Sequence, residues 1–277
     1  MDRALWNIGK GVLTLFVVLG FIFLVAPLIV VIPLSFNAEP YFTFTEGMLR
    51  LDSEAYSLRW YRNIFESEEW LRAIQNSFFI GVFATVFATI LGTLAALGLN
   101  DPRLPFRKFV GALIISPIVT PIIVVAVGVY FFYTDLGLGQ TYLGIILAHA
   151  MIGAPYVVIT VSATLANFDY TLLRAAASLG ANPWTAFRRV QLPIISRGVI
   201  TGALFAFINS FDEVVIVLFM AGLKQRTIPR EMWSGIREEI SPTILAVATL
   251  LILFVILVLI TVELLKSFGE KHKLSAN

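Results

Sequence analysis

The sequence has no cysteine among its 277 residues, and only 14% of the residues are charged. The lack of cysteine excludes disulfides, thiolate nucleophiles and Cys-ligated metals. A soluble domain has about 25% charged residues, so this chain has too few to cover a water-exposed surface. The two histidines, His149 and His272, are far apart in the sequence, and we expect no metal site. The net charge of +2 gives no indication of a nucleic-acid partner.

Apolar residues make up 58% of the chain and the mean hydropathy is +0.87, which predicts an all-α, polytopic membrane protein. A helix needs about 20 apolar residues to cross the hydrocarbon core. Six stretches reach that length, and their apolar runs do not alternate as barrel strands would. The predicted transmembrane helices are residues 11–34, 73–99, 109–133, 142–166, 199–221 and 243–265.

The distribution of basic residues predicts the orientation of these six spans. With the N-terminus inside, the inner segments hold 12 of the 20 Lys and Arg residues and the outer loops hold 8. This bias favours both termini in the cytosol. The first span is too long for the core of a signal peptide, so we expect it to be retained. We expect residues 1–277 to form a single transmembrane domain, in contact with membrane lipid.

The inner loop, residues 167–198, contains the start and stop signals of two helices. Asp169 is a good N-cap for an Ala- and Leu-rich run, and Gly180 stands where a left-handed residue ends a helix. Asn182 and Pro183 are a second start signal, and Pro193 is expected to end the second helix. The loop is therefore predicted to be ordered as a helix, a tight turn and a short helix.

Two interpretations of this loop are open from its chemistry. Trp184 and Phe187 are three residues apart and share a helix face, on which they could enter a pocket of another protein. Alternatively, the helix lies on lipid headgroups, with Trp184 at the interface and Arg188 and Arg189 near phosphates.

The same loop resembles the EAA motif (E-A-A-x3-G-x9-I-x-L-P) of ATP-binding-cassette (ABC) importer permeases. The match consists of Ala175, Ala176, Gly180, Leu192 and Pro193 at the spacing of the motif. In two places the chain departs from it: Arg174 stands where the family has Glu, and Val190 where it has Ile. The charge reversal means that an ion pair made by that Glu cannot be assumed here. Six spans with this loop between the fourth and fifth resemble type I importer permeases over essentially the whole chain.

The resemblance implies the partners and the cofactors. In that family the loop fits a groove on a separate ATPase subunit, two permeases pair, two ATP-binding subunits lie beneath them, and an extracytoplasmic protein delivers the substrate. The chain itself has no G-x-x-x-x-G-K-[ST] phosphate loop. We therefore expect a transport subunit of the bacterial inner membrane that is not an enzyme, with ATP and Mg on the partner ATPase. The coupling residues would be Arg174, Ala175, Ala176, Gly180, Trp184, Phe187, Leu192 and Pro193.

Polar residues interrupt the fifth predicted span. Asn209, Asp212 and Glu213 lie in the sequence INSFDEVVIVLFMAG. A charge inside the bilayer is costly, so it faces protein or water and is a functional candidate. Adjacent helical positions differ by about 100°, so both acids cannot point the same way. They either line the translocation pathway or form a gate or a contact between subunits.

The segment SFDEVVIVLFMAG, followed by TIPREMW and SPTILAVAT, resembles the second permease of the spermidine/putrescine branch. A carboxylate in an outer vestibule suits a cationic substrate. Other solutes carried on this fold, such as an anion, ferric ion or thiamine, remain alternatives. An ion-gradient-driven secondary transporter is the rival class, although no internal repeat is visible.

The last outer loop has an apolar period of four residues. Ile228, Met232, Ile236 and Ile240, beside Trp233, predict an amphipathic helix. It either contributes to the outer gate or the binding-protein contact, or anchors the chain at the interface.

Overall fold

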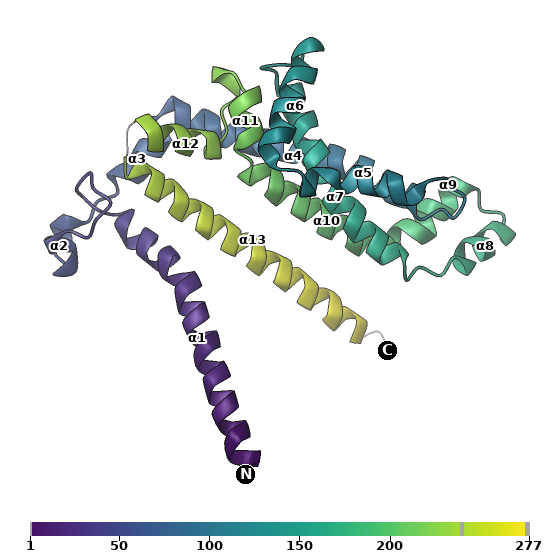
Figure 1. Ribbon diagram of the computed structural model, residues 1–277, viewed down its shortest axis with the longest axis horizontal. Helices are drawn as coiled ribbons and strands as arrows, with labels where there is room; N and C mark the ends of the chain where they lie inside the picture. The colour runs from purple at the N-terminus through teal and green to yellow at the C-terminus, as the bar shows by residue number, and fades with distance from the viewer. Residues whose placement is uncertain (1, 239–240, 275–277) are drawn as a thin grey trace. The chain divides into compact units, whose positions relative to one another are not determined.

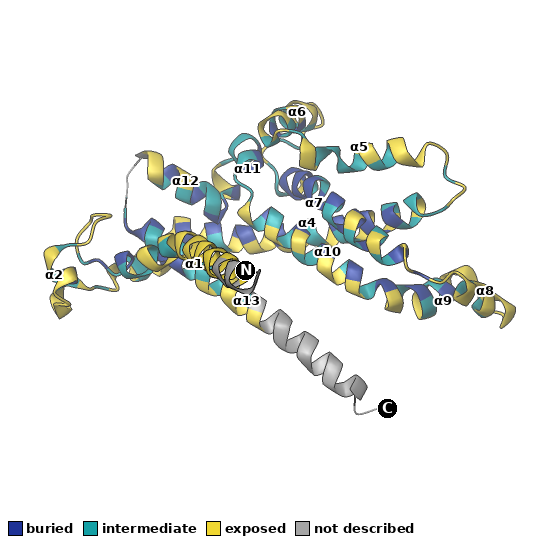
Figure 2. Ribbon diagram, turned by 60° about the horizontal axis from the view of Figure 1, so that its bottom comes forward, coloured by how far each residue is buried: buried dark blue, intermediate teal, exposed yellow. Residues whose placement is uncertain are grey.

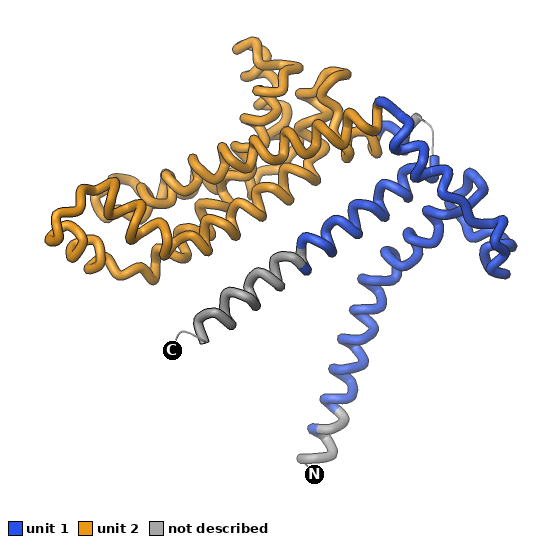
Figure 3. Tube along the Cα trace, turned by 180° about the vertical axis from the view of Figure 1, so that it is seen from behind, with its two compact units in different colours: residues 1–68, 234–277 blue, residues 69–233 orange. Residues whose placement is uncertain are grey.

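The computed structural model describes residues 2–238 and 241–274. Within these ranges the chain forms helices and no strand beyond one isolated bridge, between Asn37 and Tyr56. The all-α prediction is therefore confirmed. The chain divides into two compact units (Figure 3), one of residues 1–68 and 234–277 and the other of residues 69–233.

The first unit contains two long helices and an ordered connecting segment. Its elements are α1 (Asp2–Leu34), α2 (Glu46–Leu49), η1 (Ser53–Ala55), α3 (Arg59–Glu66) and α13 (Thr243–Leu274). The segment after α1 is folded around the buried Asn37, whose Nδ2 donates to the carbonyls of Tyr41 and Thr43. Trp60 Nε1 donates to the carbonyl of Asn37 at 2.7 Å. These bonds fix the segment between α1 and α3.

The second unit contains the elements that carry the candidate sites. They are α4 (Glu68–Leu99), α5 (Arg107–Val119), α6 (Ile122–Asp135), α7 (Tyr142–Leu165), α8 (Thr171–Ser178), α9 (Pro183–Ala186), η2 (Phe187–Gln191), α10 (Leu192–Asp212), α11 (Val215–Met220) and η3 (Leu223–Gln225), followed by α12 (Ile228–Glu238), which ends in the first unit. Helices α7 and α10 lie side by side, with α8 and α9 at one end of the pair and α6 and α11 at the other (Figure 1).

Small residues bring α4, α7 and α10 into close contact. A Cβ added at Gly202 of α10 would lie 2.7 Å from the Cα of Val157 on α7. One added at Gly153 of α7 would lie 3.2 Å from the Cβ of Ala206 and 3.4 Å from that of Ala88. Membrane helices associate through such small residues because packing replaces the hydrophobic effect. Helix α7 is buried along most of its length (Figure 2).

Several described helices have the length and composition of membrane spans. Four qualify singly: Gly9–Leu34, Glu68–Leu99, Tyr142–Leu165 and Pro183–Asp212. The pair α5 and α6 qualifies together, and α13 contributes a shorter apolar segment, Thr243–Val258. A multispanning helical protein is confirmed, whereas the count of six is not.

The predicted third span, 109–133, is not one straight helix. Helices α5 and α6 meet at an angle of 106°. Thr120, the C-cap of α5, has the extended torsions φ −74° and ψ 135°. Pro121 follows it, and the residue before a proline avoids the helical region. The break is therefore a local consequence of the Thr-Pro pair.

The fifth predicted span, 199–221, also differs from the structure. Its helix begins upstream, runs through Pro193 and ends at Asp212, and α11 is a separate helix. The prediction that Pro193 ends a helix is wrong. The segment before it is a π-helix, in which Leu192 N–H donates to the carbonyl of Phe187, five residues back. This wider turn accommodates a proline, which cannot donate, inside a continuous helix.

Candidate functional site

The first half of the loop 167–198 is a short helix, α8, whose N-cap is Tyr170 and not the predicted Asp169. Asp169 Oδ1 accepts from the backbone N–H of Thr171 at 2.9 Å, and Asp169 Oδ2 accepts from the Thr171 hydroxyl at 2.6 Å. These two hydrogen bonds lower the pKa of Asp169, and the bond from the Thr171 hydroxyl has the larger effect. Gly180 has φ +84°, a left-handed conformation that permits a tight turn after α8. The predicted helix and turn are both present.

The second half of the loop begins at the predicted cap. Asn182 Oδ1 accepts from the backbone N–H of Thr185 at 2.8 Å, and Pro183 is the first residue of α9. Trp184 and Phe187 do share a face, with ring centroids 5.6 Å apart. The Trp184 side chain is 67% exposed, so this aromatic pair is available to a partner.

A buried cluster fixes the loop to the base of α10. Phe168, just before α8, packs with Leu165 of α7 and Ile195 of α10. Leu173 of α8 and Leu192 are half-buried against the same cluster. Helix α8 thus has an inner face held by apolar contacts and an outer face of exposed residues.

The eight residues predicted to couple to an ATPase all lie on this one loop. Arg174, Ala175, Gly180, Trp184 and Pro193 are exposed, whereas Ala176, Phe187 and Leu192 are half-buried. Their exposure fits docking to another protein and also fits a position on lipid headgroups. Their role in coupling stays a prediction.

The second candidate site is the break between α10 and α11. Asp212 ends α10, and the chain then leaves the helical conformation at Glu213, where ψ is 118°. Glu213 Oε1 accepts from the backbone N–H of Ile216 at 2.9 Å. This bond satisfies one of the unpaired N–H groups at the start of α11. The two adjacent acids therefore differ in environment: Glu213 is half-buried and caps a helix, and Asp212 is exposed.

Asp212 borders an open cleft of about 250 Å³ between α7 and α10. Two aromatic rings, those of Tyr156 and Phe205, form part of its wall. They stack with their centroids 6.4 Å apart. The Tyr156 hydroxyl donates to Asn209 Oδ1 at 3.3 Å. Asn209 Nδ2 is buried and has no partner among the described residues. The cleft thus combines two carboxylates, Asp212 and Glu213, with a carboxamide and aromatic faces.

A buried hydrogen bond ties α7 to α10 beside this cleft. His149 Nδ1 and Ser210 Oγ are 2.8 Å apart, and both residues are buried. His149 is thus hydrogen-bonded between two helices. The bond fixes the rotation of α10 at the residue next to Asn209.

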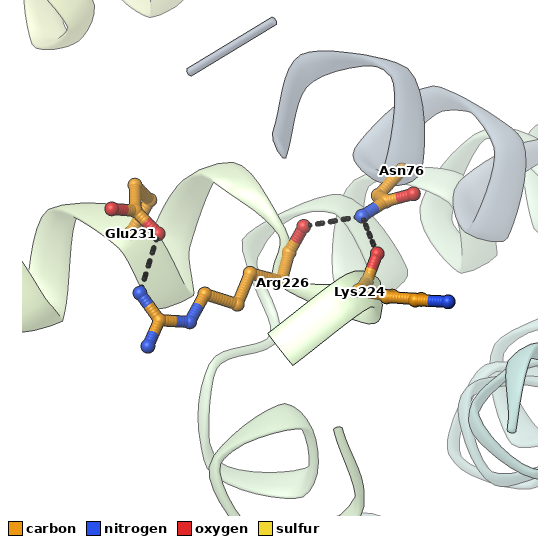
Figure 4. Close-up of polar contacts among 4 residues, drawn as sticks. All are labelled: Asn76, Lys224, Arg226 and Glu231. Carbon is orange, nitrogen blue, oxygen red and sulfur yellow. Dashed lines mark hydrogen bonds and ion pairs between the residues drawn. The ribbon is translucent and has the colours of Figure 1, made fainter. Parts of the chain in front are cut away.

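Two side chains of α4, Asn76 and Ser77, hold the segment after α11, and Figure 4 shows the contacts of Asn76. Asn76 Nδ2 donates to the carbonyls of Lys224 at 2.9 Å and Arg226 at 2.7 Å. Arg226 also pairs with Glu231 of α12 at 3.4 Å. Ser77 Oγ accepts from the backbone N–H of Ile228 at 2.8 Å. These contacts fix η3 and the start of α12 along α4.

The predicted amphipathic helix of the last loop exists as α12, Ile228–Glu238. Its predicted apolar stripe is not uniformly covered, because Ile228 is buried and Ile236 is 54% exposed. Ile240, the last residue of that stripe, lies outside the described residues.

Sequence reasoning missed three residues that shape these sites. Tyr156 and Phe205 read as ordinary apolar positions, and only the pairing of α7 with α10 brings them together. Asn76 did carry a signal, since an amide inside an apolar helix needs partners. Those partners are 148 and 150 residues away in the sequence, which no local pattern reveals.

These features, namely several apolar spans, an ordered loop held against the base of α10 and a polar cleft, are those of a membrane protein suited to transport. A family model described as "Binding-protein-dependent transport system inner membrane component" matches residues 88–267. The chain belongs to this family. It is a multi-pass inner-membrane permease of an ABC importer and not an enzyme.

Particular relatives narrow the comparison. The chain is 28% identical over 243 residues to the spermidine/putrescine transport system permease protein PotC of Escherichia coli (strain K12), covering 88% of this chain and 89% of the relative. It is 31% identical over 245 residues to the putrescine transport system permease protein PotI of the same strain, covering 84% and 83%. A crystal structure of a bacterial ABC transporter involved in the import of the acidic polysaccharide alginate contains a chain with the same fold. The TM-score is 0.73 at 17% identity, over 95% of this chain and 96% of that chain.

Proposed function

We propose that the chain is one permease subunit of an ATP-driven importer of polyamines such as spermidine and putrescine. The observation that carries this proposal is the cleft at the end of α10, where the exposed Asp212 lies beside the stacked rings of Tyr156 and Phe205. A polyamine is a methylene chain between ammonium groups. A carboxylate attracts the ammonium groups, and aromatic faces attract both cations and methylenes. The printed names of the relatives PotC and PotI support the same substrate class.

The proposed assembly follows the family. A second, homologous permease would complete the pathway as a heterodimer, and an extracytoplasmic binding protein would deliver the substrate. Two ATP-binding subunits would hold ATP and Mg and dock on the loop 167–198. Both termini and this loop would then lie in the cytosol. Asn209 and Asp212 would line the pathway, and Glu213 would hold α11 in place beside it.

The test is uptake of radiolabelled spermidine by proteoliposomes that contain the complete transporter and its binding protein. Asp212→Asn removes the charge at nearly constant volume, and we expect it to raise the KM for spermidine about ten-fold, which corresponds to about 1.4 kcal/mol. Asp135→Asn is the matched control, because Asp135 is an exposed carboxylate at the end of α6, outside the cleft. It should leave the KM unchanged.

Three results would contradict the proposal. Uptake of an anion in place of spermidine would assign another substrate class. Uptake that persists without any ATPase subunit would indicate a secondary transporter. An equal rise in KM for the Asp212 and Asp135 variants would mean that the cleft has no special part in substrate recognition.

A further inference from the structure

The outer face of α8 has apolar side chains on one side and a cationic side chain on the other. Leu173 faces the buried cluster at the base of α10, and helical geometry places Ala175 on the opposite side. Leu172 and Leu179, 41% and 89% exposed, lie on one flank of Ala175. The exposed Arg174 lies on the other flank. The free face therefore has a small centre, an apolar side and a cationic side.

The arginines at the outer surface of this loop form no close ion pair among the described residues. Arg174, Arg188 and Arg189 are exposed, and no carboxylate of the described residues forms an ion pair with any of them. The loop 167–198 contains one acid, Asp169. Both of its carboxylate oxygens accept hydrogen bonds from Thr171, and Arg174 attracts it electrostatically without forming an ion pair. The surface that a partner meets is therefore cationic and apolar.

We propose that the ATPase subunit receives α8 in a groove that is apolar toward Leu172 and Leu179 and presents a carboxylate to Arg174. The charge pair is then the reverse of one made by the Glu that the family motif places at this position. This inference rests on the proposed docking of an ATPase on the loop 167–198.

The physical reason is the cost of enclosing an unpaired guanidinium. When an interface covers an arginine, its lost hydration must be replaced by hydrogen bonds to an anion. A carboxylate offers two parallel acceptors in the geometry of the guanidinium fork. A groove lined with Lys or Arg would instead repel Arg174, so the same residue disfavours an ATPase built for a Glu.

The test uses the complete transporter with its own ATPase in lipid nanodiscs. Arg174→Lys keeps the charge and introduces an amine, which a carbodiimide joins to an adjacent carboxylate as an amide with loss of water. The unmodified chain is the matched control, since a guanidinium is not coupled. We expect one additional cross-linked peptide in the variant, which mass spectrometry maps to an Asp or Glu of the ATPase. A cross-link to phospholipid alone, or to no ATPase carboxylate, would overturn the proposal.

Charge reversal gives a second, functional measurement. Arg174→Glu should weaken ATPase binding to the permease about ten-fold or more, and reversing the mapped carboxylate to Lys should restore it. Arg237→Glu, an exposed reversal on α12 outside the loop 167–198, should have a much smaller effect. Failure of the rescue would overturn the proposal even if spermidine uptake is normal. Conversely, a mapped cross-link in a complex that does not transport spermidine would contradict only the proposed substrate.

Discussion

The carboxylate of Glu213 accepts a hydrogen bond from the backbone N–H of Ile216 at the first turn of α11. Its neighbour Asp212 accepts no such bond from α11, although both acids border the cleft beside Tyr156 and Phe205. Glu213 thus contributes to the stability of α11 as well as to the lining of the proposed pathway.

The hydrogen bond that Glu213 accepts predicts different effects for two substitutions of this residue. Glu213→Ala removes the acceptor and should lower the free energy of unfolding by about 1 kcal/mol, the usual value of a helix N-terminal cap. Glu213→Gln keeps an acceptor oxygen and should retain most of that stability. Thermal unfolding of the purified transporter in detergent measures both. If the two variants were equally destabilised, the charge and not the hydrogen bond would be what matters at Glu213.

The close approach of α7 and α10 predicts a steric effect at Gly202. A Cβ there would lie 2.7 Å from the Cα of Val157 and 2.4 Å from Thr160 Oγ1, so Gly202→Ala should force the helices apart and cost about 1–3 kcal/mol. Gly128→Ala in α6 is the control, because no atom lies within 4 Å of its added Cβ. It should be neutral or stabilising by less than about 1 kcal/mol. Similar unfolding temperatures for the two variants would contradict this packing.

The turn after α8 predicts a cost of a different kind at Gly180. Space is available there, but its φ of +84° strains any residue with a Cβ. Gly180→Ala should cost about 1–2 kcal/mol locally and lower the ratio of spermidine imported to ATP hydrolysed. Gly98→Ala, near the end of α4, has open space and no positive φ, so it should leave that ratio unchanged. Unaltered coupling in the Gly180 variant would show that this turn does not transmit the motion.

The hydrogen bonds of Asp169 predict a pH dependence. Because the Thr171 hydroxyl and N–H lower the pKa of Asp169 in the folded chain, this carboxylate stabilises the start of α8 above the unfolded pKa of about 3.9. That contribution is lost as the pH falls through the lower folded pKa. An NMR titration of labelled Asp169 should therefore give a midpoint below about 3.9, and Thr171→Ala should raise it. A midpoint that the Thr171 variant does not move would exclude the proposed cause.

The elements that were predicted from the sequence are those with local causes. Asp169, Gly180 and the pair Asn182 and Pro183 act on their own backbone or on residues three positions away at most. Their signals are therefore complete in a short window. The interruption at Asp212 was also visible, because charges inside an apolar run are costly whatever surrounds them.

The parts that the sequence could not predict depend on distant segments or on an unusual backbone. The cleft walls Tyr156 and Phe205 come from two helices, and the role of Asn76 requires carbonyls of a segment beyond α11. Pro193 failed as a stop signal because a π-helical turn precedes it, and that turn has no simple residue signature.

The helix is unbroken from Pro183 to Asp212, so the number of residues in this stretch sets the direction in which Asp212 points relative to Trp184. Each residue in a helix advances the side-chain direction by about 100°, so one residue inserted between Leu192 and Asn209 would swing Asp212 away from Tyr156 while Trp184 kept its place. Removing or adding about seven residues would nearly restore the angle but would shift the carboxylate by about 10 Å along the axis. A change in the number of residues in this stretch therefore displaces the carboxylate from the cleft in a way that a substitution does not.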